Sequence, residues 1–243
     1  MALFTAVSGT LLNALTVTIG ALLGTLIGRR FPSRIHDSLF GAIGLFTLLI
    51  GLLDAFSTKN PLVLLGALLL GVLFGELVDL EGRLNRFGDR LQQRLSHGGS
   101  TLSEAFVTST LVFCVGPLTI LGSLQNGLSG DIRDLAIKST LDGFAAVAFA
   151  ATLGWGVLLS VFVVLLYQGG LSLGAQAIEP LLKANPQTIT ELTATGGLIL
   201  VALALKLLKI RDLRVANLLP ALLFAPLIVV ALALGQQYLG VGG

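Results

Sequence analysis

Charged residues are scarce in this sequence, and so are the side chains from which most enzyme sites are built. Asp, Glu, Lys and Arg make up 12% of the 243 residues, and there are one cysteine and two histidines. The single cysteine, Cys114, excludes an intrachain disulfide. The sequence has no phosphate-binding glycine loop, no HExxH and no CxxC, and His36 lies far from His97. We therefore predict that the protein is not an enzyme and has no cofactor and no metal site.

Apolar residues, in contrast, are abundant. They make up 54% of the chain, and the mean hydropathy is +0.93. In a soluble domain about a quarter of the residues are charged, so most of this chain is expected to be surrounded by lipid. Its length provides for roughly seven or eight spans of about 20 residues with short connections. The expected fold is a single all-α, polytopic transmembrane domain covering residues 1–243.

The basic residues lie in clusters beside the apolar runs, while the net charge is only +2. Such clusters orient membrane proteins, because cytoplasmic loops are rich in Lys and Arg. The lipid bilayer is therefore an expected partner and nucleic acid is not. The first apolar run has no basic residue before it and is too long for the core of a signal peptide, so we expect it to be retained as a helix. These features predict a multi-pass protein of the bacterial inner (plasma) membrane.

Apolar runs of helical length predict the spanning segments, about seven in number. Residues 80–97 differ, because apolar side chains recur there at helical spacing beside a basic row of Arg83, Arg86, Arg90 and Arg94. That pattern predicts an amphipathic helix on the cytoplasmic surface. Residues 171–183 are mixed in character and are also placed on the surface. The predicted spans cover residues 4–28, 38–56, 61–80, 102–122, 135–167, 186–210 and 213–238.

The basic clusters predict that one of these segments is not a simple span. The clusters at 29–34, 83–94 and 206–214 hold eleven of the fifteen Lys and Arg residues, and all three are assigned to the cytoplasm. Three apolar segments lie between the last two clusters, yet the number of crossings there must be even. Glycines and Pro117 interrupt the helical pattern, so we predict a broken or re-entrant element near 102–143. Such backbone must be buried by protein or line a wet cavity. A crossing by residues 171–183 is the alternative.

The densest group of polar residues lies within this interrupted region. Asp134, Lys138 and Asp142 are spaced four apart, so on a helix they share one face and Lys138 can neutralise one carboxylate. An ionisable group at the centre of a membrane costs roughly 2.5 to 3.5 kcal/mol and usually has a function. The alternative is an ordinary interfacial loop, with Asp142 tied to Lys138 for packing. The candidate path residues here are Gln125, Asn126, Asp131, Asp134, Lys138 and Asp142, of which Asp142 is the deepest.

A faint internal echo adds a second set of candidates. TVTIGALLG from Thr16 and TATGGLILV from Thr193 share two threonines and a glycine in register, and transporters are often built from repeats. Asn13 and Thr16 in the first helix, with Glu191 and Thr195 in the penultimate one, are candidates to complete a polar cavity opposite Asp142. The alternative is that these groups serve as interhelical hydrogen bonds, or that Glu191 caps a helix start.

Glycines recur at every fourth position near the end of the first helix. Gly20, Gly24 and Gly28 form a smooth ridge that lets another helix approach closely. That helix belongs either to the same chain, which we favour, or to a second copy in a homo-oligomer.

Two central stretches resemble a known family. FCVGPLTILGSLQNGLSGD from Phe113 and KSTLDGFAAVAFAATLGWGV from Lys138 resemble the YdfK/YqgA-type bacterial membrane proteins, the domain of unknown function 554. The resemblance extends from LLNALTVTIGALLG at Leu11 to the last helices. It implies a multi-pass membrane protein but carries over no substrate and no site residues.

The leading hypothesis is a secondary transporter or channel for a small ion or polar metabolite, with its path around residues 116–143. Asp142 would be the cation or proton site, and Gln125 and Asn126 would supply neutral ligands. A carboxylate favours a cation, but nearby basic residues leave an anion open. The alternative is a membrane scaffold or regulatory subunit, in which the glycine ridge and the basic surface helix bind partner proteins or anionic lipid. A membrane-embedded enzyme ranks third, because no nucleophile with a matching base is visible.

Overall fold

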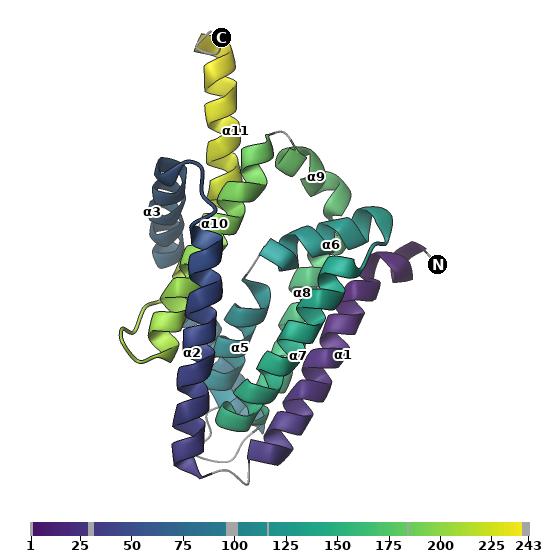
Figure 1. The fold of residues 1–243 in the computed structure, drawn as a ribbon, viewed down its shortest axis with the longest axis vertical. Helices are drawn as coiled ribbons and strands as arrows, with labels where there is room; N and C mark the ends of the chain where they lie inside the picture. Colours follow the sequence, from purple (N-terminus) through teal and green to yellow (C-terminus); the bar gives the residue numbers. More distant parts are fainter. Residues whose placement is uncertain (1, 29–31, 96–101, 116, 184, 240–243) are drawn as a thin grey trace.

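The computed structural model describes residues 2–28, 32–95, 102–115, 117–183 and 185–239, and all regular structure in that part of the chain is helical (Figure 1). The first half contains α1 (Ala2–Gly28), α2 (Ser33–Ala55), α3 (Pro61–Val78), α4 (Leu80–Leu95), α5 (Leu102–Cys114) and α6 (Pro117–Ser129). The second half contains α7 (Arg133–Leu153), η1 (Trp155–Leu159), α8 (Ser160–Leu173), α9 (Ala175–Lys183), α10 (Pro186–Leu207), η2 (Val215–Leu218) and α11 (Ala221–Leu239).

The number of membrane spans agrees with the prediction. Six helical stretches among the described residues are long and apolar enough to cross a bilayer, and α2 adds a shorter apolar stretch, Gly41–Ala55. Helices α5 and α6 pass the same test together as a seventh span, but they are bent by 61° between Cys114 and Leu118. This bend confirms the broken element predicted near 102–143.

The amphipathic surface helix is also confirmed, as α4. Its arginines Arg83, Arg86, Arg90 and Arg94 are exposed, whereas the ring of Phe87 packs on that of Phe106 in α5, with 5.7 Å between the ring centroids. The side chains of Leu91 and Leu95, and residues 96 and 97 of the predicted helix, lie outside the described residues.

One predicted segment was wrong, because the run 135–167 is not one helix. Gly154 adopts the left-handed region, with φ of 87°, and separates α7 from η1 and α8. Glycine takes this conformation without steric cost, and the apolar residues on both sides hid the boundary from the sequence. Four units, namely α5 with α6, α7, α8 and α10, therefore run in alternating directions (Figure 1). Four crossings are an even number, so the basic clusters before and after them can lie on the same side of the membrane. No predicted segment therefore has to be excluded as a span. Residues 171–173 complete α8, and α9 alone is the short connecting helix.

Close helix pairs build the bundle. The ridge of Gly20, Gly24 and Gly28 in α1 packs against α7, where a side chain at any of the three would collide with the backbone carbonyl of Gly143, Val147 or Ala151, respectively. Helix α2 packs in the same close way on α10, through Gly51 and Gly197. Small residues permit this approach of backbones in membrane proteins. The pairs α1–α7 and α2–α10 form two walls, and the space between them holds the site described below.

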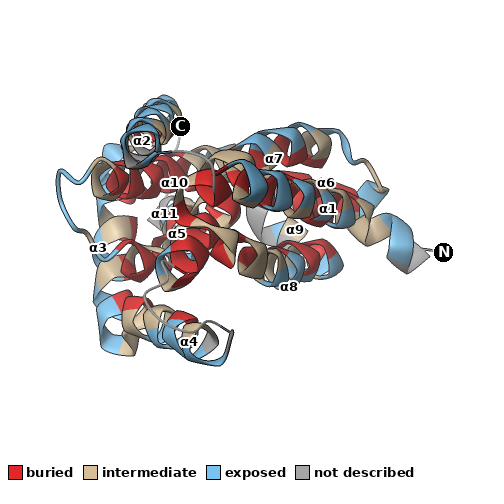
Figure 2. Cartoon of the chain, turned by 90° about the horizontal axis from the view of Figure 1, so that it is seen from below, coloured by how far each residue is buried: buried red, intermediate tan, exposed pale blue. Residues whose placement is uncertain are grey.

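The burial pattern suits a lipid environment. Seen from below, the buried residues gather at the centre of the bundle around α5 and α10, and the outer helix faces are exposed (Figure 2). Many exposed side chains are large and apolar, for example Leu77 at 86% and Phe144 at 73%. A soluble protein rarely exposes contiguous apolar surface on this scale, so these faces are where lipid chains would lie.

Candidate functional site

The site is centred on a buried ion pair in α7. Lys138 and Asp142 are spaced one helical turn apart, and the Nζ atom of Lys138 bonds the Oδ2 atom of Asp142. Only 5% of Lys138 and 7% of Asp142 is exposed. A charge removed from solvent is tolerated when it is paired and hydrogen-bonded, and Lys138 supplies the opposite charge here. The pair lies in the first half of a helix long enough to span the membrane.

Asn13 connects this ion pair to two other helices. Its Nδ2 group in α1 donates hydrogen bonds to Asp142 Oδ2 and to Gln168 Oε1 of α8, both at 2.9 Å. Asn13 and Gln168 are at most 1% exposed. Sequence reasoning selected Asn13 but missed Gln168, whose signal was an amide in an otherwise apolar run. The carboxylate is therefore held by donors from α1 and α7, and α8 is joined to it through Asn13.

Several polar atoms beside this group have no hydrogen-bond partner among the described residues. They are Asn13 Oδ1, Gln168 Nε2, Thr10 Oγ1 and Ser172 Oγ. Thr10 lies three residues before Asn13 and Ser172 four after Gln168, and α1 and α8 run in opposite directions (Figure 1). The two hydroxyl groups therefore extend the polar group toward the same end of the bundle. Buried polar groups normally have a protein or water partner. The unpartnered atoms between α1 and α8 are therefore available to hydrogen-bond water or a polar solute.

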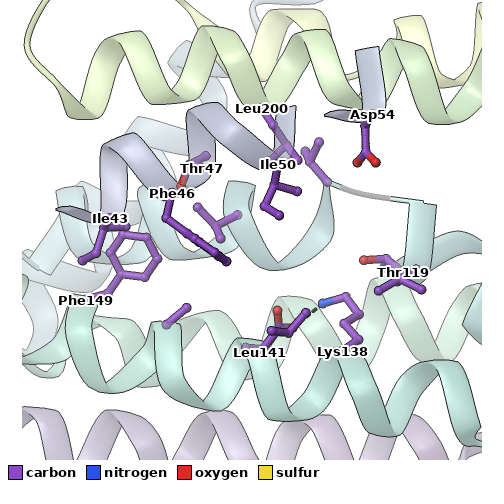
Figure 3. A pocket seen from close by; sticks show the side chains of 15 residues that line it. Ile43, Phe46, Thr47, Ile50, Asp54, Thr119, Lys138, Leu141, Phe149 and Leu200 are labelled. Carbon is purple, nitrogen blue, oxygen red and sulfur yellow. Dashed lines mark hydrogen bonds and ion pairs between the residues drawn. The ribbon is translucent and has the colours of Figure 1, made fainter. Parts of the chain in front are cut away.

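A pocket of about 370 Å³ reaches the ion pair from its other side. Figure 3 shows Lys138 and Thr119 on one wall and Asp54 of α2 on the wall facing them. Most of the lining is apolar. The complete lining is Ile43, Phe46, Thr47, Ile50, Asp54, Val112, Val115, Leu118, Thr119, Lys138, Leu141, Asp142, Ala145, Phe149 and Leu200. Asp142 bonds Asn13 and also lines the pocket. It therefore lies between the pocket and the polar side chains of α1 and α8, which are Thr10, Asn13, Gln168 and Ser172.

Asp54 was missed by sequence reasoning. It lies in the last turn of α2 and is partly buried, and its carboxylate forms no hydrogen bond or ion pair with the described residues. The available signal was that Asp54 is the only charged residue in the apolar run 38–56. Without knowing which helix faces α2, however, that signal could not be connected to Lys138 or Asp142.

The other candidates of the interrupted region do not join the ion pair. Asn126 fixes α6 to the start of α1, because its Oδ1 accepts from Gly9 N at 3.1 Å and its Nδ2 donates to Thr5 O at 3.0 Å. Gln125 is exposed and Asp134 is partly buried. Asp131 pairs with exposed Arg133 at 2.6 Å, and hydrogen bonds from that guanidinium hold the pKa of Asp131 below its ordinary value.

The candidates from the internal echo are also distributed differently from the expectation. Thr16 donates to the carbonyl of Asn13 at 3.0 Å and Thr195 to that of Glu191 at 2.7 Å. Glu191 is completely buried in α10 and accepts from Thr58 Oγ1, Lys59 N and Asn60 N at 2.6 to 2.9 Å. It therefore holds the turn between α2 and α3. Glu191 bonds this turn because α10 packs on α2, whereas the donors to Asp142 come from α1 and α7. Neither Glu191 nor Thr195 lines the pocket that reaches Asp142.

A third buried carboxylate, that of Glu81, also has a structural position. Glu81, at the start of α4, bonds Lys206 Nζ at 2.7 Å and the backbone N–H of Ala216 at 2.8 Å. Its own N–H donates to Asn217 Oδ1 at 2.8 Å. These bonds join α4 to the end of α10 and to η2.

Within the described residues, no group of three or more His, Cys, Asp or Glu side chains is arranged to hold a metal ion.

Comparisons with known proteins agree with this architecture. A family model described as "Protein of unknown function (DUF554)" matches residues 8–230. The chain is 30% identical over 226 residues to the "Uncharacterized membrane protein YdfK" of Bacillus subtilis (strain 168), which covers 91% of this chain and 95% of that protein. It is 34% identical over 224 residues to the "Uncharacterized protein YqgA" of Escherichia coli (strain K12), covering 90% and 94%. No solved structure is significantly similar. As its central stretches predicted, the chain is a membrane protein that belongs to the DUF554 family.

Proposed function

We propose that this membrane protein is a secondary transporter or channel for a small ion or polar metabolite. The observation that carries the proposal is the position of the Lys138–Asp142 pair, which is buried in a spanning helix and also lines a pocket. Ionisable groups inside a membrane are costly and commonly mark the route of an ion or a solute. A pair needed only for packing would not have to border a cavity.

The helix break next to the pocket supports the same function. Val115 and Leu118, on either side of the bend between α5 and α6, both line the pocket. Transporters often place their binding sites at discontinuous helices, where backbone groups are free to face a solute. The unused hydrogen-bonding atoms of Asn13 and Gln168 lie beyond Asp142, so the proposed path has polar groups on both sides of the carboxylate.

The scaffold alternative is weaker. One of its two proposed binding surfaces was the glycine ridge, and Gly20, Gly24 and Gly28 are covered by α7. The basic face of α4 is the remaining surface for anionic lipid or a partner protein.

Flux in proteoliposomes tests the proposal. Purified protein is reconstituted and assayed with a panel of inorganic ions and polar metabolites, and Asp142→Asn is compared with Asp131→Asn, which removes a partly buried acid outside the pocket. We expect the first variant to lose flux and the second to retain it. Because Asp142→Asn leaves Lys138 unpaired, the double variant Lys138→Gln/Asp142→Asn serves as a second test without a lone buried charge. Wild-type flux equal to that of empty vesicles across the panel would overturn the proposal.

The location proposed for this activity is the bacterial inner membrane. The high apolar content and the helical spans support it, because outer-membrane spans are typically β-barrels. Separation of inner and outer membranes from cells producing the protein is the direct test, and recovery in the outer-membrane fraction would contradict it.

A further inference from the structure

Asp54 is an uncompensated acid on the wall of the pocket. Its carboxylate has no hydrogen-bond or ion-pair partner among the described residues, and it lies in the last turn of α2, which contains no basic residue. The C-terminal end of a helix carries partial negative charge, so a carboxylate there is disfavoured and a cation is attracted. Neither the helix nor a described side chain therefore balances the charge of Asp54.

The charged side chains that line the pocket add up to a net negative charge. Lys138 is the described cation in the lining, and it is already paired with Asp142. Asp54 is then the unpaired charge among the described residues of the lining. The hydroxyl groups of Thr47 and Thr119 add polarity without charge, and that of Thr119 is already bonded to the carbonyl of Phe113 at 3.2 Å. The charge of the lining thus favours a cationic solute over an anionic one.

The rest of the lining favours an organic cation over an inorganic one. Hard metal cations need about six oxygen ligands, and the described lining is mostly apolar. Figure 3 shows Asp54, Thr119 and Lys138 toward one end of the pocket, and Ile43, Phe46 and Phe149 toward the other. Aromatic faces and aliphatic side chains suit the apolar body of a small molecule. A volume of about 370 Å³ is at the lower end of the range for small-molecule sites.

We infer that the pocket binds a small organic ammonium compound, with the ammonium group on Asp54 and an apolar body between Phe46 and Phe149. This inference rests on the proposed function in assigning the pocket to the transported solute, and it names the chemical class of that solute. In this arrangement Asp54 selects for positive charge, and the Lys138–Asp142 pair forms a neutral polar part of the opposite wall.

Binding of benzylamine to the purified full-length protein tests the inference by calorimetry at neutral pH. Benzoate, which has the opposite charge, and phenylalanine, which is a zwitterion, are the comparison probes. We expect benzylamine to bind more tightly than both. Asp54→Asn should weaken its binding about tenfold or more, as expected for loss of a charge-assisted contact, and Asp131→Asn should leave it unchanged. Because the side chain of Asp54 bonds no described residue, the melting temperature of Asp54→Asn should stay near that of the wild type.

Other outcomes separate this inference from the proposed function. No benzylamine binding, equal binding to wild type and Asp54→Asn, or tighter binding of benzoate or phenylalanine would overturn the inference. Flux is measured with benzyltrimethylammonium, whose permanent charge prevents unaided passage through the bilayer. Benzylamine binding that depends on Asp54, without flux of any solute, would retain the binding site and overturn transport. Flux of another solute without benzylamine binding would retain transport and overturn the binding site for an organic ammonium compound.

Discussion

The Nδ2 group of Asn13 donates a hydrogen bond to the Oδ2 atom of Asp142 at 2.9 Å, although 129 residues separate the two in the chain. The same amide donates to Gln168. One small side chain in α1 therefore stabilises the carboxylate of α7 and holds α8 in position. Since Asp142 Oδ2 also accepts from Lys138, that oxygen has two donors from two helices.

Asn13→Leu should destabilise the protein by about 1 to 3 kcal/mol, because it leaves Gln168 Oε1 without its donor and Asp142 with one donor fewer. Unfolding in detergent, followed by circular dichroism, measures the change. Gln125→Leu is the control, since Gln125 is exposed, and it should change stability by much less. Equal effects of the two variants would show that the Asn13 bonds contribute little.

The ion pair predicts strong coupling between its two members. Lys138→Met alone should cost about 3 to 5 kcal/mol, because it leaves Asp142 buried without its counter-charge. Lys138→Met/Asp142→Leu removes both charges and should be less destabilised than the single variant. A double-mutant cycle on unfolding free energies gives the coupling energy, and additive single effects would contradict a buried pair.

The sequence indicated some of these features because their causes are local. The spacing of Lys138 and Asp142 requires only a helix, and the basic row of α4 is visible as a helical pattern. The break at Gly154 was missed because apolar residues continue on both sides of it. Asp54, Gln168 and the bonds of Glu191 depend on which helix faces which. That arrangement is set by contacts such as Glu191 with Thr58, 133 residues apart, which no local pattern contains.

The contact between α1 and α7 predicts different tolerance at two helical glycines. Gly24→Ala places a methyl group against the backbone carbonyl of Val147, whereas the same change at Gly41 in α2 meets nothing within 4 Å. Overpacking typically costs 1 to 3 kcal/mol, so Gly24→Ala should lower the melting temperature. Gly41→Ala should leave it unchanged or raise it, because alanine has the higher helix propensity. Thermal melts of the two variants in one detergent make the comparison, and a Gly24→Ala melt equal to wild type would show that the two helices separate easily.

Acid should weaken the corner where α3 meets α4. Asp79 bonds Arg86 at 3.0 Å and also bonds Arg214, and these contacts, the hydrogen bond from Arg86 first, hold its pKa below the ordinary value of 3.8. A carboxyl group whose pKa is lowered in the folded protein stabilises the fold at pH values above its ordinary pKa. The contribution is lost as the pH falls through the lowered pKa, when the folded protein takes up the proton.

Asp79→Asn should therefore lower the melting temperature at neutral pH. The difference in melting temperature between this variant and the wild type should become smaller as the pH falls below about 4. Asparagine suits the comparison because Asp79 has a φ of 54°, and Asn tolerates this left-handed backbone as Asp does. Asp89→Asn, which removes an exposed acid from α4 outside this cluster, is the control variant. Melting curves of the three proteins at several pH values provide the measurement. A gap between Asp79→Asn and wild type that stays constant from neutral to acidic pH would mean that the charge of Asp79 contributes nothing to stability.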